Sequence, residues 1–208
     1  MHIKIDHIAK IEGHAGFTAD IAGGNVAQAK LDIREGARLL EGILRGRSIY
    51  EVSQIAARIC GVCPVVHTLT SLKALEKALN VEVSERTILL RKLMMLGQII
   101  NSHALHLFFF SLSDFFGFKN DLALIKKFPE RAKDALAIRA FGNRLIEVIG
   151  GRSIHPLTPT IGGFLKLPNI KNLGALFSQS DEVLAASQRM AKLFIKLNYP
   201  DFTRAAPY

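Results

Sequence analysis

Cysteine is scarce in this chain, because only Cys60 and Cys63 occur among its 208 residues. Two thiols at this spacing do not provide the disulfide framework of a small secreted protein. We therefore expect reduced thiols and a cytoplasmic location. Residues 1–7 contain no apolar run, so we also expect no signal peptide.

The chain also lacks a concentrated basic segment and a second pair of zinc ligands. Its net charge is +9, but Lys and Arg are scattered among acidic residues, which argues against nucleic-acid binding. No Cys/His pair with zinc-finger spacing follows Cys63, so a closed structural zinc site fits poorly. Hydrophobic residues reach 49%, and we expect a partner to cover some of this apolar surface.

Residues 93–113 lack charged side chains over the length of a membrane span. Polar side chains that would be costly in lipid interrupt this stretch, namely Gln98, Asn101, Ser102, His103 and His106. We therefore predict no membrane span. The stretch is expected to form the long central helix of a bundle, buried on nearly all sides.

Residue periodicity predicts a mainly α-helical fold with a small N-terminal antiparallel β-sheet. Residues 17–21 and 26–33 flank a glycine-containing turn and are expected to form a β-hairpin. Helical patterns cover residues 36–46, 49–58, 64–79, 84–116, 129–149 and 173–197. A segment rich in Pro and Gly, residues 152–164, is expected to form a shaped loop.

No linker divides the chain. We therefore expect a single domain over residues 1–208, with a β-hairpin region at 1–35 and helices at 36–208.

Cys60 and Cys63 form a CxxC unit, and His67 follows four residues after Cys63. Pro64 suits the first turn of a helix, so Cys63 falls near a helix N-terminus, where a thiolate is favoured. His67 lies one turn further on the same face, within reach of the Cys63 sulfur. Two thiolates make half of a metal site, while a redox pair and half of a zinc knuckle are the alternatives.

Other polar residues could act together with the cysteines. Glu12 fits either a surface glutamate at the start of a strand or a carboxylate that approaches a buried site. Glu41 lies among leucines, and its position favours a solvated helix residue over a metal ligand. His103 and His106 are three residues apart on the apolar helix, which favours hydrogen-bonded core histidines over ligands.

The order of these motifs resembles the N-terminal half of the [NiFe] hydrogenase large subunit. The resemblance covers essentially the whole chain and is closer to the cytoplasmic, cofactor-coupled groups than to periplasmic uptake enzymes. It is carried by Ile11-Glu12-Gly13-His14, Leu40-Glu41, Gly46-Arg47, the Arg58-to-His67 segment, Gln98, Ser102-His103, His106, Asp114, Gly150-Gly151-Arg152, His155-Pro156 and Gly162-Gly163.

This resemblance implies that Cys60 is a terminal nickel thiolate and that Cys63 bridges nickel to an iron bearing cyanide and carbon monoxide. It further implies that Glu12 relays protons, that His67 hydrogen-bonds the bridging cysteine, and that Glu41 binds a structural magnesium or iron ion. The implied activity is reversible oxidation of H2 to protons. Electrons would pass to the iron–sulfur clusters of a small subunit and onward to a nicotinamide, deazaflavin or ferredoxin acceptor.

Two departures from the family pattern limit what the chain can do alone. The family's second CxxC pair is absent, so another chain or segment must supply it. Ser102 stands where several members carry an aspartate. The alternative function is therefore a non-catalytic scaffold subunit of a redox complex, comparable to the quinone-site subunit of respiratory complex I.

Overall fold

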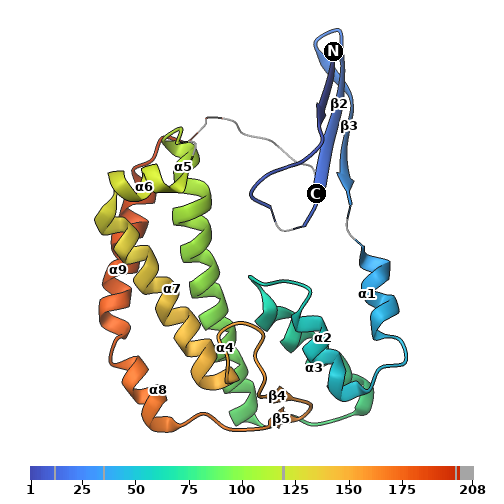
Figure 1. Ribbon diagram of the computed structural model, residues 1–208, viewed down its shortest axis with the longest axis vertical. Helices are drawn as coiled ribbons and strands as arrows, with labels where there is room; N and C mark the ends of the chain where they lie inside the picture. Colours follow the sequence, from blue (N-terminus) through green and yellow to red (C-terminus); the bar gives the residue numbers. More distant parts are fainter. Residues whose placement is uncertain (12, 35, 119, 200, 202–208) are drawn as a thin grey trace. The chain divides into compact units, whose positions relative to one another are not determined.

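The computed structural model describes residues 1–11, 13–34, 36–118, 120–199 and 201. Its contacts divide the chain into two compact units, Met1–Arg47 and Ser48–Tyr208, and each is described by itself. The predicted fold class, mainly helical with a small N-terminal antiparallel sheet, is confirmed (Figure 1). The expectation of a single domain stays a prediction.

The first unit is built on three antiparallel strands, β1 (His2–Ile5), β2 (Ala15–Ala22) and β3 (Asn25–Ile33), in the order β1-β2-β3. Gly23 and Gly24 form the β2–β3 turn at φ angles of 58° and 80°, which glycine adopts without a Cβ clash. The predicted hairpin is therefore confirmed. Strand β1 was not predicted, because its four residues are too few to show a clear alternating pattern. The short helix α1 (Ala37–Leu44) follows the sheet in the chain.

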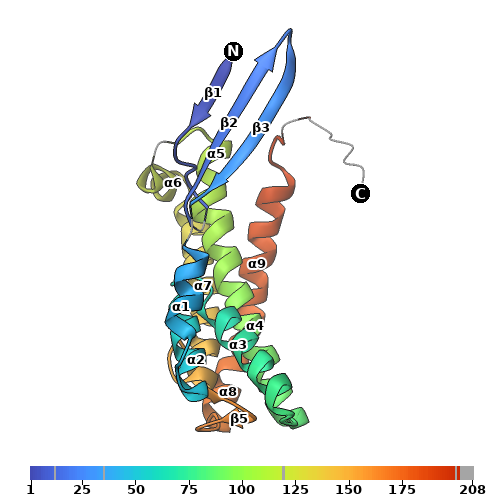
Figure 2. The ribbon, with the colours of Figure 1, turned by 90° about the vertical axis from the view of Figure 1, so that its right-hand side faces the viewer.

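Three long helices form most of the second unit. Helices α4 (Glu85–Ala104), α7 (Pro129–Gly150) and α9 (Ser180–Ile195) run side by side (Figure 1). In Figure 1, α7 lies between α4 and α9, and Figure 2 shows the same helices after a quarter turn about the vertical axis. The remaining elements are α2 (Ile49–Ala57), α3 (Pro64–Leu79), α5 (Leu112–Phe115), α6 (Asp121–Lys127), β4 (Pro159–Thr160), β5 (Gly163–Phe164) and α8 (Ile170–Phe177).

Two glycines allow α4 and α7 to cross in close contact. A Cβ atom on Gly97 would lie 2.8 Å from the Gly142 carbonyl oxygen, and one on Gly142 would lie 2.6 Å from the Gly97 carbonyl oxygen. Apolar clusters lie along the same helices, one including Val65, Met94, Phe141, Leu145 and Ile146, the other Phe108, Leu112, Leu124, Ile138 and Met190. Both helices of this crossing, α4 and α7, contribute residues to each of the two clusters.

The prediction that the apolar helix is buried on nearly all sides is wrong. Leu89, Leu96 and Ile99 are 59%, 50% and 41% exposed, because α7 covers only one side of α4. Glu85–Phe115 is the one helical stretch among the described residues that is long and apolar enough to span a membrane, by length and composition alone. Core helices of soluble proteins pass the same test.

The predicted helix over residues 84–116 is not uniform. Leu105–Ser111 forms a π-helical segment, here labelled η1, between α4 and α5. The predicted helix over residues 173–197 is likewise two helices, because the chain turns between α8 and α9. Periodicity did not reveal the π-helical segment, because residues 105–110 are almost all apolar. It did not reveal the break between α8 and α9 either, because the polar residues there, 178–182, also fit the solvent-facing side of a helix.

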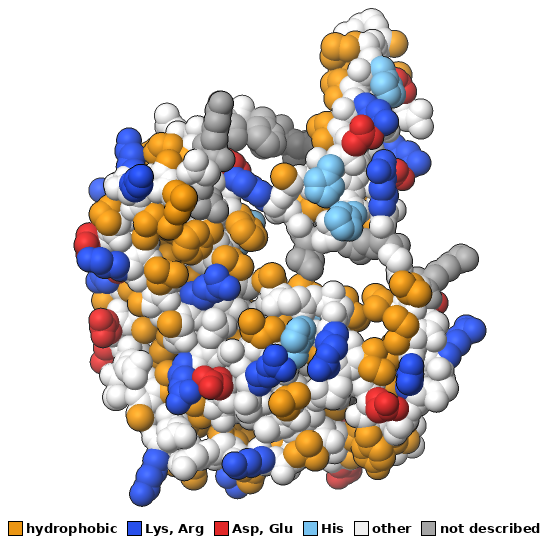
Figure 3. Space-filling view, viewed as in Figure 1, with side chains coloured by type: hydrophobic (Ala, Val, Ile, Leu, Met, Phe, Trp, Pro, Cys, Tyr) orange, Lys and Arg blue, Asp and Glu red, His pale blue; other side chains and the backbone are white. Residues whose placement is uncertain are grey.

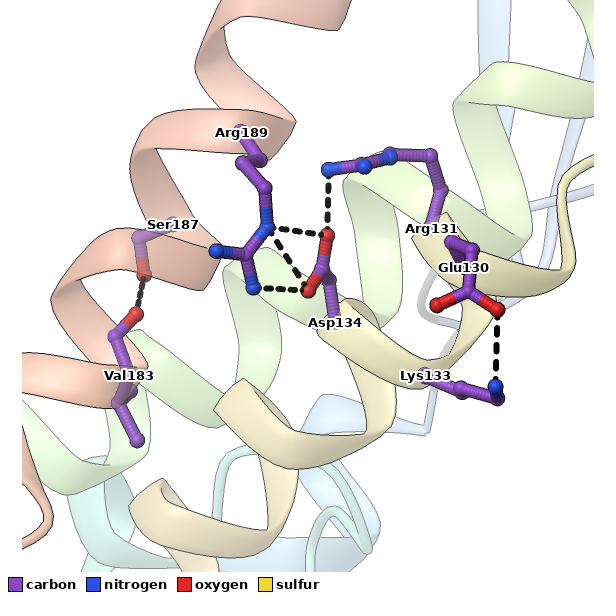
Figure 4. Close-up of polar contacts among 7 residues, drawn as sticks. All are labelled: Glu130, Arg131, Lys133, Asp134, Val183, Ser187 and Arg189. Atoms are coloured by element: carbon purple, nitrogen blue, oxygen red, sulfur yellow. Dashed lines mark hydrogen bonds and ion pairs between the residues drawn. The ribbon is translucent and has the colours of Figure 1, made fainter.

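An ion-pair cluster fastens α9 to α7. The Asp134 carboxylate, only 7% exposed, accepts hydrogen bonds from Arg189 on α9 at 2.5 to 3.2 Å and from Arg131 at 2.5 Å (Figure 4). The hydrogen bonds from Arg189 outweigh burial and hold the pKa of Asp134 below its ordinary value. Lys133, which directly precedes Asp134, forms an exposed pair with Glu130 one turn earlier in α7.

Figure 3 shows Lys and Arg side chains interspersed with hydrophobic and acidic ones over the face seen there. This mixture agrees with the scattered charge of the sequence.

Candidate metal centre

The two cysteines lie in the short loop that joins α2 to α3. Helix α2 begins at a capping box, in which Ser48 and Glu51 satisfy each other's backbone N–H groups, and it ends at Ala57. Cys63 is the N-cap of α3 and Pro64 occupies the first turn, as the sequence predicts. Cys60 is only 4% exposed and Cys63 is half-buried, so the loop presents its sulfurs from within the fold.

The loop curls around the Cys60 sulfur. The backbone N–H groups of Val62 and Cys63 lie 3.2 and 3.3 Å from Cys60 Sγ and donate to it. Sulfur that accepts hydrogen bonds from backbone donors is a common feature of thiolate ligands, because the donors offset its negative charge. The local geometry is therefore compatible with metal ligation by Cys60.

His67 lies where the helical spacing predicts. Its Nε2 atom is 3.5 Å from Cys63 Sγ, and both residues are partly buried. The ring can therefore hydrogen-bond or orient this sulfur. Whether it does so on a metal-bound thiolate stays a prediction.

Residues far along the chain hold both ends of the loop. On the upstream side, Gln54 Nε2 donates to the Pro156 carbonyl at 3.3 Å, and His155 Nδ1 lies 2.9 Å from the Ala57 carbonyl. On the downstream side, the Gln98 side chain on α4 contacts the backbone of Val62 and of Val65. Gln98 and His155-Pro156 are among the residues that carry the resemblance, but no sequence pattern predicts that they contact this loop.

The described structure does not test whether the two predicted carboxylates, Glu12 and Glu41, belong to this site. Glu12 lies outside the described residues. Glu41 is exposed on α1, in the first compact unit, whereas the cysteines belong to the second. The roles implied for Glu12 and Glu41 stay predictions.

The preference for buried core histidines on the apolar helix is wrong. His103 and His106 are both exposed, because they lie on the side of the helix that α7 leaves open. His103 Nδ1 lies 2.8 Å from the Ile99 carbonyl, and His106 Nδ1 lies 3.2 Å from Ser111 Oγ. Ser102 is partly buried and donates to the Ile99 carbonyl at 3.3 Å.

Within the described part of the chain, no group of three or more His, Cys, Asp or Glu side chains could hold a metal ion. Of these residues, Cys60 and Cys63 could therefore form only part of a ligand set. Two thiol side chains at this spacing are suited to a thiolate-bound metal such as nickel or iron.

Comparisons with known proteins identify the family. Residues 38–132, which include the cysteine loop, match the family model described as nickel-dependent hydrogenase. The chain is 37% identical over 194 residues to sulfhydrogenase 2 subunit alpha of Pyrococcus furiosus, a match that covers 93% of this chain and 47% of that subunit. The chain is a homologue of hydrogenase large subunits.

Further comparisons of this hydrogenase homologue agree in sequence and in fold. Sulfhydrogenase 1 subunit alpha of Pyrococcus furiosus is 35% identical over 195 residues, covering 94% of this chain and 46% of that one. The crystal structure of an NAD+-reducing [NiFe]-hydrogenase in the H2-reduced state superposes with a TM-score of 0.85 at 29% identity, over 94% of this chain and 45% of that one. This hydrogenase homologue spans about half the length of the relatives it matches.

Proposed function

We propose that this chain contributes Cys60 and Cys63 to a nickel–iron centre that catalyses reversible H2 oxidation. The observation that carries the proposal is the loop around the Cys60 sulfur, with two backbone donors at 3.2 and 3.3 Å, in a homologue of hydrogenase large subunits. Cys60 would be a terminal nickel ligand and Cys63 would bridge nickel and iron. When bound, the centre supplies the site at which H2 is split and its electrons are accepted.

The protein's own residues would handle the sulfur and the protons. His67, 3.5 Å from Cys63 Sγ, would orient the bridging thiolate. Glu12 would relay protons away from the centre, since a carboxylate can accept and release a proton near the site. Glu41 would bind a magnesium or iron ion with a structural role. These three assignments rest on the family motifs.

The chain would act within a complex. A segment or second polypeptide with another CxxC pair would complete the ligand set, since no group of three or more His, Cys, Asp or Glu among the described residues could hold a metal ion. An iron–sulfur small subunit would receive the electrons. We propose a cytoplasmic location, because two cysteines at CxxC spacing suit a reducing compartment.

The test is metal analysis of the complex purified from its native source through a tag on this chain. We expect nickel and iron, together with a companion chain that carries the second CxxC pair and is identified by mass spectrometry. Cys60→Ser should remove nickel and H2 oxidation together. Thr70→Ala, at an exposed position further along α3, is the matched control and should keep both.

Full H2 oxidation by the Cys60→Ser complex would overturn the catalytic proposal. An intact complex without nickel, and without a companion bearing a CxxC pair, would instead support the non-catalytic scaffold function. Zinc in place of nickel would indicate a structural metal site.

A further inference from the structure

We infer that Gln98 is a positioning residue that orients the peptide group between Val62 and Cys63 and thereby aims a backbone donor at the Cys60 sulfur. The inference rests on the proposed function of the two cysteines as metal ligands. Gln98 is a buried residue on α4, and the loop residue that it contacts, Val62, lies 36 residues earlier in the chain.

The Gln98 side chain makes two hydrogen bonds of opposite kind. Its Nε2 donates to the Val62 carbonyl at 2.5 Å, and its Oε1 accepts from the Val65 N–H at 3.4 Å. Only 3% of the residue is exposed, so water does not compete for either bond. A carboxamide is suited to this position because it donates and accepts at once.

The Val62 carbonyl and the Cys63 N–H belong to one planar peptide group. In a trans peptide these two bonds point in opposite directions, so a hydrogen bond at one end sets the direction of the other. Gln98 holds the oxygen end, while the Cys63 N–H donates to Cys60 Sγ at 3.3 Å. Releasing the oxygen would allow the peptide to rotate and the sulfur to lose a donor.

Gln98 is itself held in a fixed position. It follows Gly97, whose close contact with Gly142 leaves no room for a Cβ atom on either residue. The backbone of α4 therefore cannot move closer to α7 at this point without a clash. The loop thus takes its geometry from the most tightly packed part of the helical unit.

The experiment compares the full chain with Gln98→Met, which keeps the side-chain length but removes the donor and the acceptor. Amide hydrogen exchange measured by NMR reports on the loop without any metal. We expect exchange at Cys63 and Val65 to accelerate by about tenfold, the factor that one net hydrogen bond represents. Titration with Cd2+, followed by thiolate absorption, should show an affinity about 10- to 100-fold weaker.

Asn101→Ala is the matched control, because Asn101 is a buried amide one turn further along α4 that accepts from Arg139 Nε at 3.1 Å. It should leave loop exchange and Cd2+ affinity unchanged. Gln98→Asn keeps the carboxamide but is too short to reach both partners. This variant replaces Gln98→Met in the experiment if Gln98→Met does not fold. It should also accelerate amide hydrogen exchange at Cys63 and Val65.

Unchanged loop exchange in both Gln98 variants would overturn the inference, as would an equal acceleration in Asn101→Ala. The exchange result does not depend on metal. If the wild-type chain fails to bind Cd2+ through its thiols, that result counts against the proposed ligand pair, while the exchange result still decides the role of Gln98.

Discussion

A buried ion pair joins three separate parts of the helical unit. Glu76 on α3 and Arg91 on α4 are 5% and 7% exposed, and two hydrogen bonds of 2.8 and 2.6 Å link their side chains. Gly162 N–H donates to Glu76 Oε1 at 2.8 Å, and Arg91 Nη2 donates to the Thr160 carbonyl at 3.0 Å. The pair therefore fastens the β4–β5 hairpin to both helices.

Burial raises the pKa of Glu76, but hydrogen bonds from Arg91 and Gly162 outweigh burial and hold that pKa below its ordinary value. Stability from a depressed carboxyl pKa is fully present above the pKa of the unfolded chain, about 4.3. It is lost as the pH falls through the pKa of the folded protein, because the proton then binds and weakens the pair.

Glu76→Gln should lower the free energy of unfolding at pH 7 by about 3 kcal/mol, because it leaves the Arg91 charge buried without its partner. The difference from wild type should narrow as the pH falls below about 4.3, the pKa of a glutamate in the unfolded chain, and then through the lowered pKa of Glu76 in the folded protein. Urea unfolding between pH 3 and 7 measures both effects.

The control is Glu147→Gln, which breaks an exposed pair with Arg144 and should change stability by less than about 1 kcal/mol. Two outcomes would contradict the role given to the buried pair. One is an equal loss of unfolding free energy in the two variants at pH 7, and the other is a loss in Glu76→Gln that stays the same from pH 7 to pH 3.

At the scale of the elements, the crossing of α4 and α7 decides how the core and the cysteine loop are placed. A Cβ atom on Gly142 would lie 2.6 Å from the Gly97 carbonyl oxygen and 2.7 Å from the Asn101 backbone nitrogen. Both neighbours are backbone atoms, so they cannot move aside as a flexible side chain could. The helices would have to separate.

Gly142→Ala should therefore lower the free energy of unfolding by about 1–3 kcal/mol, despite the better helix propensity of alanine. Gly174→Ala on α8 is the control, because nothing lies within 4 Å of the added Cβ atom. It should instead raise stability by up to about 1 kcal/mol. Thermal and urea unfolding distinguish the two, and stabilisation by Gly142→Ala would show that the crossing is not tight.

At the scale of the whole molecule, the second unit leaves an apolar face open along α4. A groove of about 540 Å³ runs between α4, α7 and α9, and its lining includes Ile99, His103, Leu107, Phe194 and Tyr199. Exposed apolar area of this kind is typical of surfaces that another polypeptide covers. The high hydrophobic content of the sequence is consistent with this face.

The isolated chain should bind the apolar dye ANS on this face. Leu96→Lys combined with Ile99→Lys should lower ANS fluorescence while leaving the unfolding temperature nearly unchanged, because both side chains are already about half exposed. Leu136→Lys, at a 52% exposed position on α7, is the control for adding charge elsewhere. An equal fall in fluorescence in the control would show that the α4 face is not the binding surface.

Much of the local structure could be predicted because it depends on neighbours in the chain. The β2–β3 turn follows from Gly23 and Gly24, and the approach of His67 to Cys63 follows from the four-residue spacing of a helix. The start of α3 at Cys63 and Pro64 follows from the missing N–H of proline. The sequence by itself therefore determined the hairpin, the start of α3 and the chemical character of the loop, but not the interruptions in the long helical segments.

Only the tertiary structure decided which faces are buried and which distant groups meet. Periodicity shows that α4 is apolar, but not that α7 covers one side and leaves His103 and His106 exposed. The contacts of Gln98 with the cysteine loop and of Glu76 with Gly162 span 36 and 86 residues. Such contacts depend on how helices pack in three dimensions, and the spacing of residues along one helix does not contain that information.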